Sequence, residues 1–135
     1  MLTELRTKIY SIGSTVSGSQ GFYYVSEPQD TNYPHTNYFL VDDVIDKQQT
    51  GGKYDNFILQ FSLFDRRQLT NGNLIAAATL EKTAEELITK FNAGDLSLTG
   101  YRLTNKAIQF IRPAVVVDSL YWQIIIQYNL EYERN

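Results

Sequence analysis

The sequence predicts a single α+β domain, residues 1–135, with helices packed on one face of a mostly antiparallel sheet of about four main strands. Two segments carry apolar residues every three or four positions, and two others alternate apolar with polar residues. The order along the chain is helix, hairpin, helix, hairpin, which is typical of α+β domains. A chain of 135 residues with 43% hydrophobic and 20% charged residues is long enough for one well-packed core.

The first predicted element is a helix near the N-terminus. We expect it to end near Gly13, and its apolar stripe consists of Leu2, Leu5, Ile9, Ile12 and Val16. Small residues at 17–21 predict a loop, and residues 22–25 predict a short extended segment. Residues 27–36 include two prolines and predict an irregular connection.

The first hairpin follows. Residues 38–45 are predicted as one strand and residues 56–64 as a stronger one, whose inward face is Phe57, Leu59, Phe61 and Leu63. The side chain of Gln60 would lie on the opposite face. Residues 46–55 contain two adjacent glycines and predict a long hairpin loop.

The second helix begins after a turn at residues 71–73. Its apolar face consists of Leu80, Ala84, Leu87, Ile88 and Phe91. Glu86 and Lys90 are spaced for a favourable ion pair. We expect Gly94 to follow the helix in the left-handed region. Its length makes this helix the main cover of the sheet.

The second hairpin carries the clearest pattern in the chain. Residues 101–111 and 114–118 predict a strand region with Pro113 at an edge or bulge. The last strand alternates polar residues with Trp122, Ile124, Ile126, Tyr128, Leu130 and Tyr132. Its polar face is mostly neutral amide, including Gln123 and Gln127, whereas a solvated edge usually carries charge. This composition favours a face that another surface covers.

The composition argues against several function classes. A net charge of −3 with scattered basic residues disfavours a dedicated nucleic-acid binder. The absence of cysteine excludes disulfides, thiolate nucleophiles and cysteine metal sites. The longest obvious apolar run, residues 114–117, is far too short to span a bilayer, and the N-terminal segment is no secretory signal, so we expect a soluble protein.

No residue pattern predicts an enzyme, a cofactor or a metal. His35 is the only histidine, and it lies in a predicted loop without a nucleophile marked nearby. The carboxylates of Asp42, Asp43, Asp46 and Asp55 suit Mg²⁺ or Ca²⁺, but their spacing matches no calcium loop, so a solvated strand end is favoured.

The glycine-rich segment of the first hairpin is not a phosphate loop. Gly51, Gly52 and Lys53 lack the spacing and the Ser or Thr that such a loop requires. A mobile hairpin tip that becomes ordered against a partner is the favoured interpretation. Arg66 and Arg67 fit either a solvated strand exit or pairing with carboxylates of a neighbouring subunit.

Several stretches together carry a resemblance to a known family. The first runs from residues 25–28 by way of residues 33–34 to the predicted strand at 38–43. The second runs from the strand at 57–64 by way of Arg66 and Arg67 to the helix that ends at 92–94. The others are residues 98–103 and the terminal strand 122–133. In pattern and order the chain resembles the tail terminator (tail completion) proteins of long-tailed bacteriophages. The resemblance covers nearly the whole chain, and lengths depart from it at residues 17–21 and 47–54.

The resemblance implies a structural virion protein of the tail and neck, assembled in the host cytoplasm. Six copies would form a ring that caps the head-proximal end of the tail tube, ends tube polymerisation and joins tail to head. The implied partners are further copies of the chain, the tail tube protein and the head–tail connector or stopper protein. Genomic DNA would pass through the channel without specific binding, which agrees with the mild acidity.

Within this interpretation we predict two groups of interface residues. The outer face of the sheet, around Gln60, Gln123 and Gln127, would meet a neighbouring subunit's edge or helix. The hairpin loop would contact the tube or the connector through Gln48, Gln49, Thr50, Gly51, Gly52 and Lys53. Two alternatives stay open: another neck or tube protein, such as a head-completion or stopper protein, and a small ligand-binding α+β domain.

Overall fold

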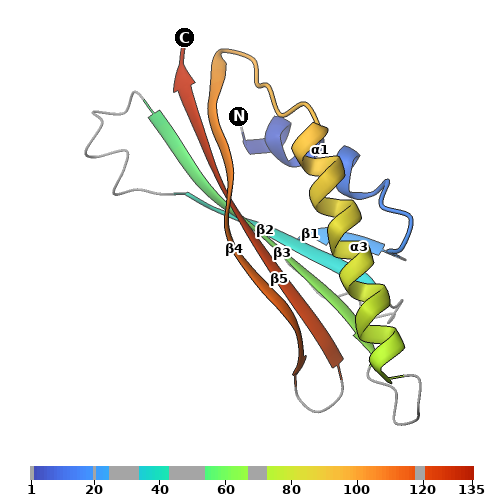
Figure 1. Cartoon of the computed structure of the whole chain (residues 1–135). Coiled ribbons are helices and arrows are strands. Elements are labelled where there is room, and N and C mark those ends of the chain that lie inside the picture. The colour runs from blue at the N-terminus through green and yellow to red at the C-terminus, as the bar shows by residue number, and fades with distance from the viewer. Residues whose placement is uncertain (1, 20, 25–33, 43–53, 67–72, 118–120) are drawn as a thin grey trace.

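The computed structural model describes residues 2–19, 21–24, 34–42, 54–66, 73–117 and 121–135. Within these ranges, two helices and five strands form an α+β fold (Figure 1). Their bounds in chain order are α1 Leu2–Gly13, β1 Gly21–Tyr24, β2 His35–Asp42, β3 Tyr54–Arg66, α3 Asn73–Ala93, β4 Tyr101–Val117 and β5 Tyr121–Arg134. None of the described helices combines the length and apolar character needed to cross a membrane.

The strands form one sheet in the order β1-β2-β3-β5-β4. β2, β3, β5 and β4 pair antiparallel, whereas β1 pairs parallel to β2. The predicted α+β class is confirmed, but the prediction of about four strands is wrong by this added edge strand. Four residues are too few to show a period, and their pairing partner cannot be read from local sequence.

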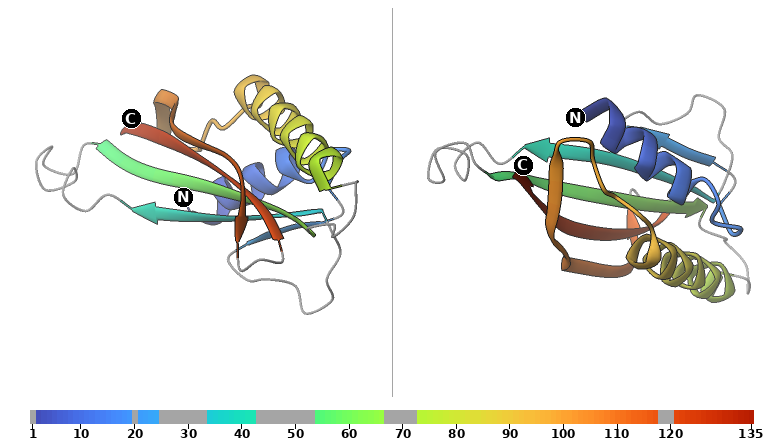
Figure 2. Two further views of the ribbon diagram at one scale, coloured as in Figure 1. Left: turned by 60° about the horizontal axis from the view of Figure 1, so that its bottom comes forward. Right: turned by 90° about the horizontal axis from the view of Figure 1, so that it is seen from above.

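Alternation along β3 and β5 builds the core. Phe61 lies opposite Ile126, and both side chains are buried on the same face. The helices cover this face with Leu5 and Ile9 of α1 and with the apolar stripe of α3 (Figure 2). The core cluster joins the helices to the inward side chains Tyr38, Phe57, Leu59, Phe61, Leu63, Ile124, Ile126, Tyr128, Leu130 and Tyr132. Neither of the described helices lies on the opposite face of the sheet.

The C-terminal end of α3 differs from the prediction. Gly100 has a positive φ of 81°, and Gly94, predicted to be left-handed, does not. A Cβ at Gly94 would lie 2.4 Å from Ile12 Cδ1, so the absence of a side chain at this position allows α1 to pack closely. The Lys106 ammonium from β4 donates to the α3 carbonyl oxygens of Phe91 (2.9 Å) and Asn92 (2.9 Å), and to that of Gly94 (3.1 Å). A cation from a distant strand therefore satisfies these carbonyls.

A second contact joins α3 to the segment after α1. The predicted pair Glu86–Lys90 is present, with Nζ 3.4 Å from Oε1. Ser17 donates to Glu86 from its backbone N–H (3.1 Å), and Lys90 donates to the carbonyl oxygen of Thr15 (2.6 Å). This pair therefore holds the α1–β1 connection against α3.

Candidate interaction surface

The outer face of the sheet is its face opposite the helices. Four strands contribute side chains to this face, as their register shows: Phe39, Val41, Ile58, Gln60, Phe64, Phe110, Gln123, Ile125 and Gln127. Most are half-buried, and Val41 and Phe110 remain 46% and 45% exposed. On this face, which the described helices leave uncovered, apolar side chains therefore lie beside neutral amides.

The predicted glutamines do lie together on this face. Gln60 and Gln127 are directly opposite, and Gln127 Nε2 donates to Gln60 Oε1 at 2.7 Å. Gln60 Nε2 donates to Ser62 Oγ at 3.3 Å, and Arg112 Nη2 donates to Gln123 Oε1. Each amide has two N–H groups and two oxygen lone pairs, so these bonds leave capacity for a partner.

β4 forms the outer edge of the sheet. Over its 17 residues, large apolar side chains are exposed on both faces: Ile108, Phe110, Ile111, Val115 and Val116. Its pairing with β5 shifts register three times, once across Pro113. Bulges and proline interrupt the row of backbone groups that an added strand would need. The edge therefore offers side chains rather than a regular backbone ladder.

A groove runs between α3 and β4 on the inner side of this edge. The α3–β4 groove has a volume of about 270 Å³ and is lined by Glu81, Ala84, Glu85, Ile88, Ile111, Pro113 and Ile124. Its floor is apolar, and its two charged lining residues are both acidic. Of the exposed apolar residues of β4, Ile111 lies directly in it.

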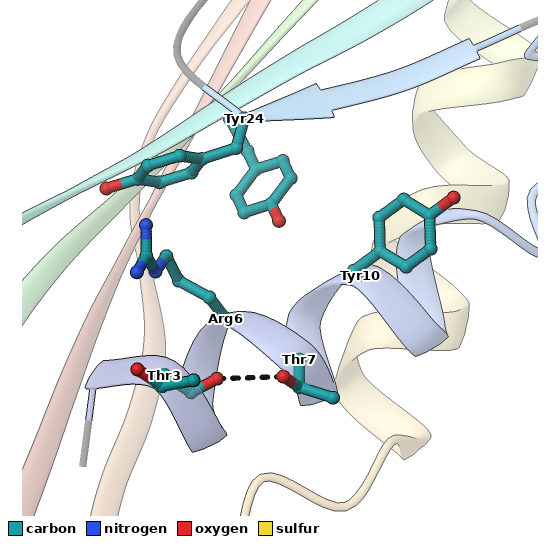
Figure 3. A pocket seen from close by; sticks show the side chains of 6 residues that line it. Thr3, Arg6, Thr7, Tyr10 and Tyr24 are labelled. Atoms are coloured by element: carbon teal, nitrogen blue, oxygen red, sulfur yellow. Dashed lines mark hydrogen bonds between the residues drawn. The ribbon is translucent and has the colours of Figure 1, made fainter.

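A second hollow lies at the opposite edge, between α1 and β1 (Figure 3). Its volume is about 320 Å³, and it is lined by Thr3, Arg6, Thr7, Tyr10, Tyr24 and Tyr38. The Arg6 guanidinium lies over the Tyr24 ring, with Cζ 4.7 Å from the centroid. Cation–π contact holds the arginine beside tyrosine rings while leaving its N–H groups to face the hollow.

Of the other predicted interface residues, the structure describes Arg66, which strand register places on the same face as Gln60 and Phe64, at the end of β3. Arg66 is the exposed last residue of β3, paired across the sheet with Tyr121. The hairpin loop joins β3 at Tyr54, which is the other end of that 13-residue strand, roughly 40 Å away. Arg67 and the loop residues 48–53 lie outside the described residues.

The candidate catalytic and metal residues take structural positions. His35 was predicted in a loop, which is wrong: it begins β2, is 3% exposed, and packs against the rings of Tyr23 and Phe64 at 6.0 and 5.3 Å. Asp55 is buried, and Arg134 Nε donates to its Oδ2 at 3.4 Å. Asp42 is the last residue of β2, and residues 43–53 lie outside the described part. Within that part, no three His, Asp or Glu side chains are grouped to hold a metal ion.

Local patterns did not predict the groove or the hollow. Both depend on which strands lie at the sheet edges, and that order is set by long-range pairing. One signal was present in the sequence: residues 107–117 contain apolar residues without alternation, which is typical of a strand with apolar side chains on both faces.

No protein-family model matches this chain, and no curated protein sequence matches it. The function proposed below is therefore supported by the surfaces described above and by the pattern of the sequence.

Proposed function

We propose that this chain is a structural virion protein of the tail-terminator type, which assembles into a ring that caps the head-proximal end of a phage tail tube. The observation that supports the proposal most strongly is the outer face of the sheet: neither of the described helices covers it, and it combines apolar side chains with neutral amides. A sheet normally buries its apolar side chains against another layer. Here the second layer would be another protein surface.

The outer face suits a protein contact better than a small-ligand site. It is spread over four strands, and its polar groups include three glutamine amides, which bind a partner without the desolvation cost of charges. Both described hollows lie at the sheet edges and open to solvent, whereas a ligand site is usually a concave apolar cleft with convergent polar groups.

In the proposed ring, each copy contacts two neighbours through different surfaces, which is the arrangement that closes a cyclic assembly. The outer face around Gln60, Gln123 and Gln127 meets a neighbour's edge or helix. The ring ends tube growth because it covers the last tube subunits and presents no surface on which the next subunit can add. DNA passes through its channel, and the connector or stopper protein binds its other side.

Solution mass tests this proposal first. Native mass spectrometry over a range of concentrations should show a closed six-subunit species. A ladder of ever longer polymers would instead indicate a tube protein. The second measurement is tube length by electron microscopy, with the cognate tail tube protein polymerised with and without the chain. Capped tubes should stop growing, and unchanged tube growth in the presence of the chain would refute the terminator role.

The hairpin loop has its own test. We propose that residues 48–53 contact the tube or the connector, because they precede Tyr54, the end of β3 opposite Arg66. Deleting Gly51 and Gly52 should leave the melting temperature nearly unchanged and reduce docking to tail tubes in a co-sedimentation assay. Docking equal to that of the wild type would exclude the loop from this contact.

A further inference from the structure

We propose that a second copy of this chain occupies the α3–β4 groove, inserting the α1 edge of its own sheet. The α1 edge is defined by Leu2, Arg6, Tyr10 and Tyr24. This inference rests on the proposed ring and adds a second pair of contacting surfaces to the outer-face contact between neighbouring copies.

The receiving surface is apolar with an acidic rim. The groove floor consists of Ala84, Ile88, Ile111, Pro113 and Ile124. The exposed residues Glu81 and Glu85 are one helical turn apart on α3 and line the same groove. An apolar floor below two like charges fits an apolar segment that carries a cation.

The α1 edge has this chemistry. Leu2 is 50% exposed, Tyr10 is 53% exposed and Tyr24 is 37% exposed. Arg6 projects from α1 towards Tyr24, with its guanidinium over the Tyr24 ring (Figure 3). Among the described residues, no carboxylate lies within ion-pair distance of Arg6, whereas a copy seated in the groove would bring it to Glu81 and Glu85.

The two surfaces lie at opposite edges of the molecule. α1 lies beside β1 and β2, and α3 lies towards β4, at the other end of the strand order (Figure 2, right). The contact is therefore head-to-tail, so each copy receives one neighbour and inserts into another. Because β4 is bulged and contains Pro113, the contact is made by side chains in the groove and not by continuing the sheet.

Charge exchange tests this contact. Arg6→Glu should raise the Kd of self-association at least about tenfold, because it places three carboxylates together. The double variant Glu81→Lys, Glu85→Lys should do the same by placing three cations together. Lys82→Glu is the matched control, since it changes net charge as Arg6→Glu does, at an exposed position of α3 outside the groove lining. The control should assemble as the wild type does.

Mixing the two weakened variants supplies the decisive measurement. Each retains one native surface and carries one reversed surface, so alternating copies restore opposite charges at every contact. Equimolar mixtures should recover the wild-type mass in native mass spectrometry, in a ring with an even number of subunits. Circular dichroism melting of each variant verifies that it is folded.

The outcomes separate this contact from the proposed function. Wild-type rings with unaltered assembly of Arg6→Glu and of the double variant would overturn the contact and leave the ring in place. Failure of the mixture to recover assembly would also overturn it. A wild-type chain that stays monomeric into the millimolar range would overturn the contact, while the tube-length measurement would still decide the terminator role.

Discussion

Phe110 offers the most direct test of whether the outer face contributes to the proposed assembly. It lies on β4 opposite Gln127, and 45% of it is exposed. A phenylalanine side chain has about 200 Å² of surface, so a partner that covers the exposed part removes about 90 Å² from water. At about 25 cal/mol per Å², this burial contributes about 2 kcal/mol per contact. Phe110→Ser should therefore raise the Kd of self-association about 30-fold per contact.

The same substitution also affects the isolated subunit. About 110 Å² of the Phe110 side chain already packs within the subunit, and losing that contact costs about 3 kcal/mol of unfolding free energy at most. A domain of this size would melt up to about 10 °C lower and stay folded at 25 °C. Phe110→Leu is the matched control, because it keeps an apolar side chain of similar size and should retain assembly.

Sedimentation velocity over a concentration series measures the effect. The midpoint between monomer and ring should move to higher concentration for Phe110→Ser and stay close to the wild-type value for Phe110→Leu. Thermal melting followed by circular dichroism establishes that both variants are folded. If folded Phe110→Ser assembled at the wild-type concentration, the outer face around β4 would not be buried by a neighbour.

Two further predictions concern the fold that presents these surfaces. Lys106→Met should lower the free energy of unfolding by about 2 kcal/mol, because the ammonium no longer donates hydrogen bonds to the carbonyl oxygens at the end of α3. Urea unfolding measures this loss, with Lys82→Met as the control. Equal losses in the two variants would refute the capping role. Burial raises the pKa of Tyr128 from its ordinary value of 10.0 to about 12, so the unfolded chain loses this proton first as the pH rises. Stability should hold below pH 10 and fall as the pH rises towards 12, and Tyr128→Phe should make this fall shallower; an identical pH profile for the two proteins would contradict the assignment.

Local periodicity predicted the parts of the fold in which one strand face is buried. In β3 and β5 the side chains alternate between core and outer face, so the sequence itself records which residues turn inward. The same alternation placed Gln60, Gln123 and Gln127 together on one face, which is confirmed. The outward placement of these residues needed no knowledge of strand order.

Long-range pairing decided what local patterns missed. β4 is an edge strand with apolar side chains on both faces, so it lacks the alternation that identifies the other strands. The capping of α3 by Lys106 joins residues more than ten positions apart, through the return of the chain across the sheet. His35 followed a proline and was assigned to a loop, but pairing with β3 extends β2 back to it. Each miss is a tertiary contact that overrides a local preference.

The edge strand β4 shows how such a chain can present apolar surface without uncontrolled polymerisation. A long, regular, apolar edge would pair with any similar edge and lead to aggregation. In β4, three register shifts and Pro113 break the ladder, whereas the apolar side chains remain exposed. Association then requires a surface shaped to fit those side chains, which selects a partner and an angle of approach. A fixed angle between heterologous surfaces determines whether copies close into a ring or continue as a filament. The bulged edge is therefore consistent with an assembly that stops at one ring.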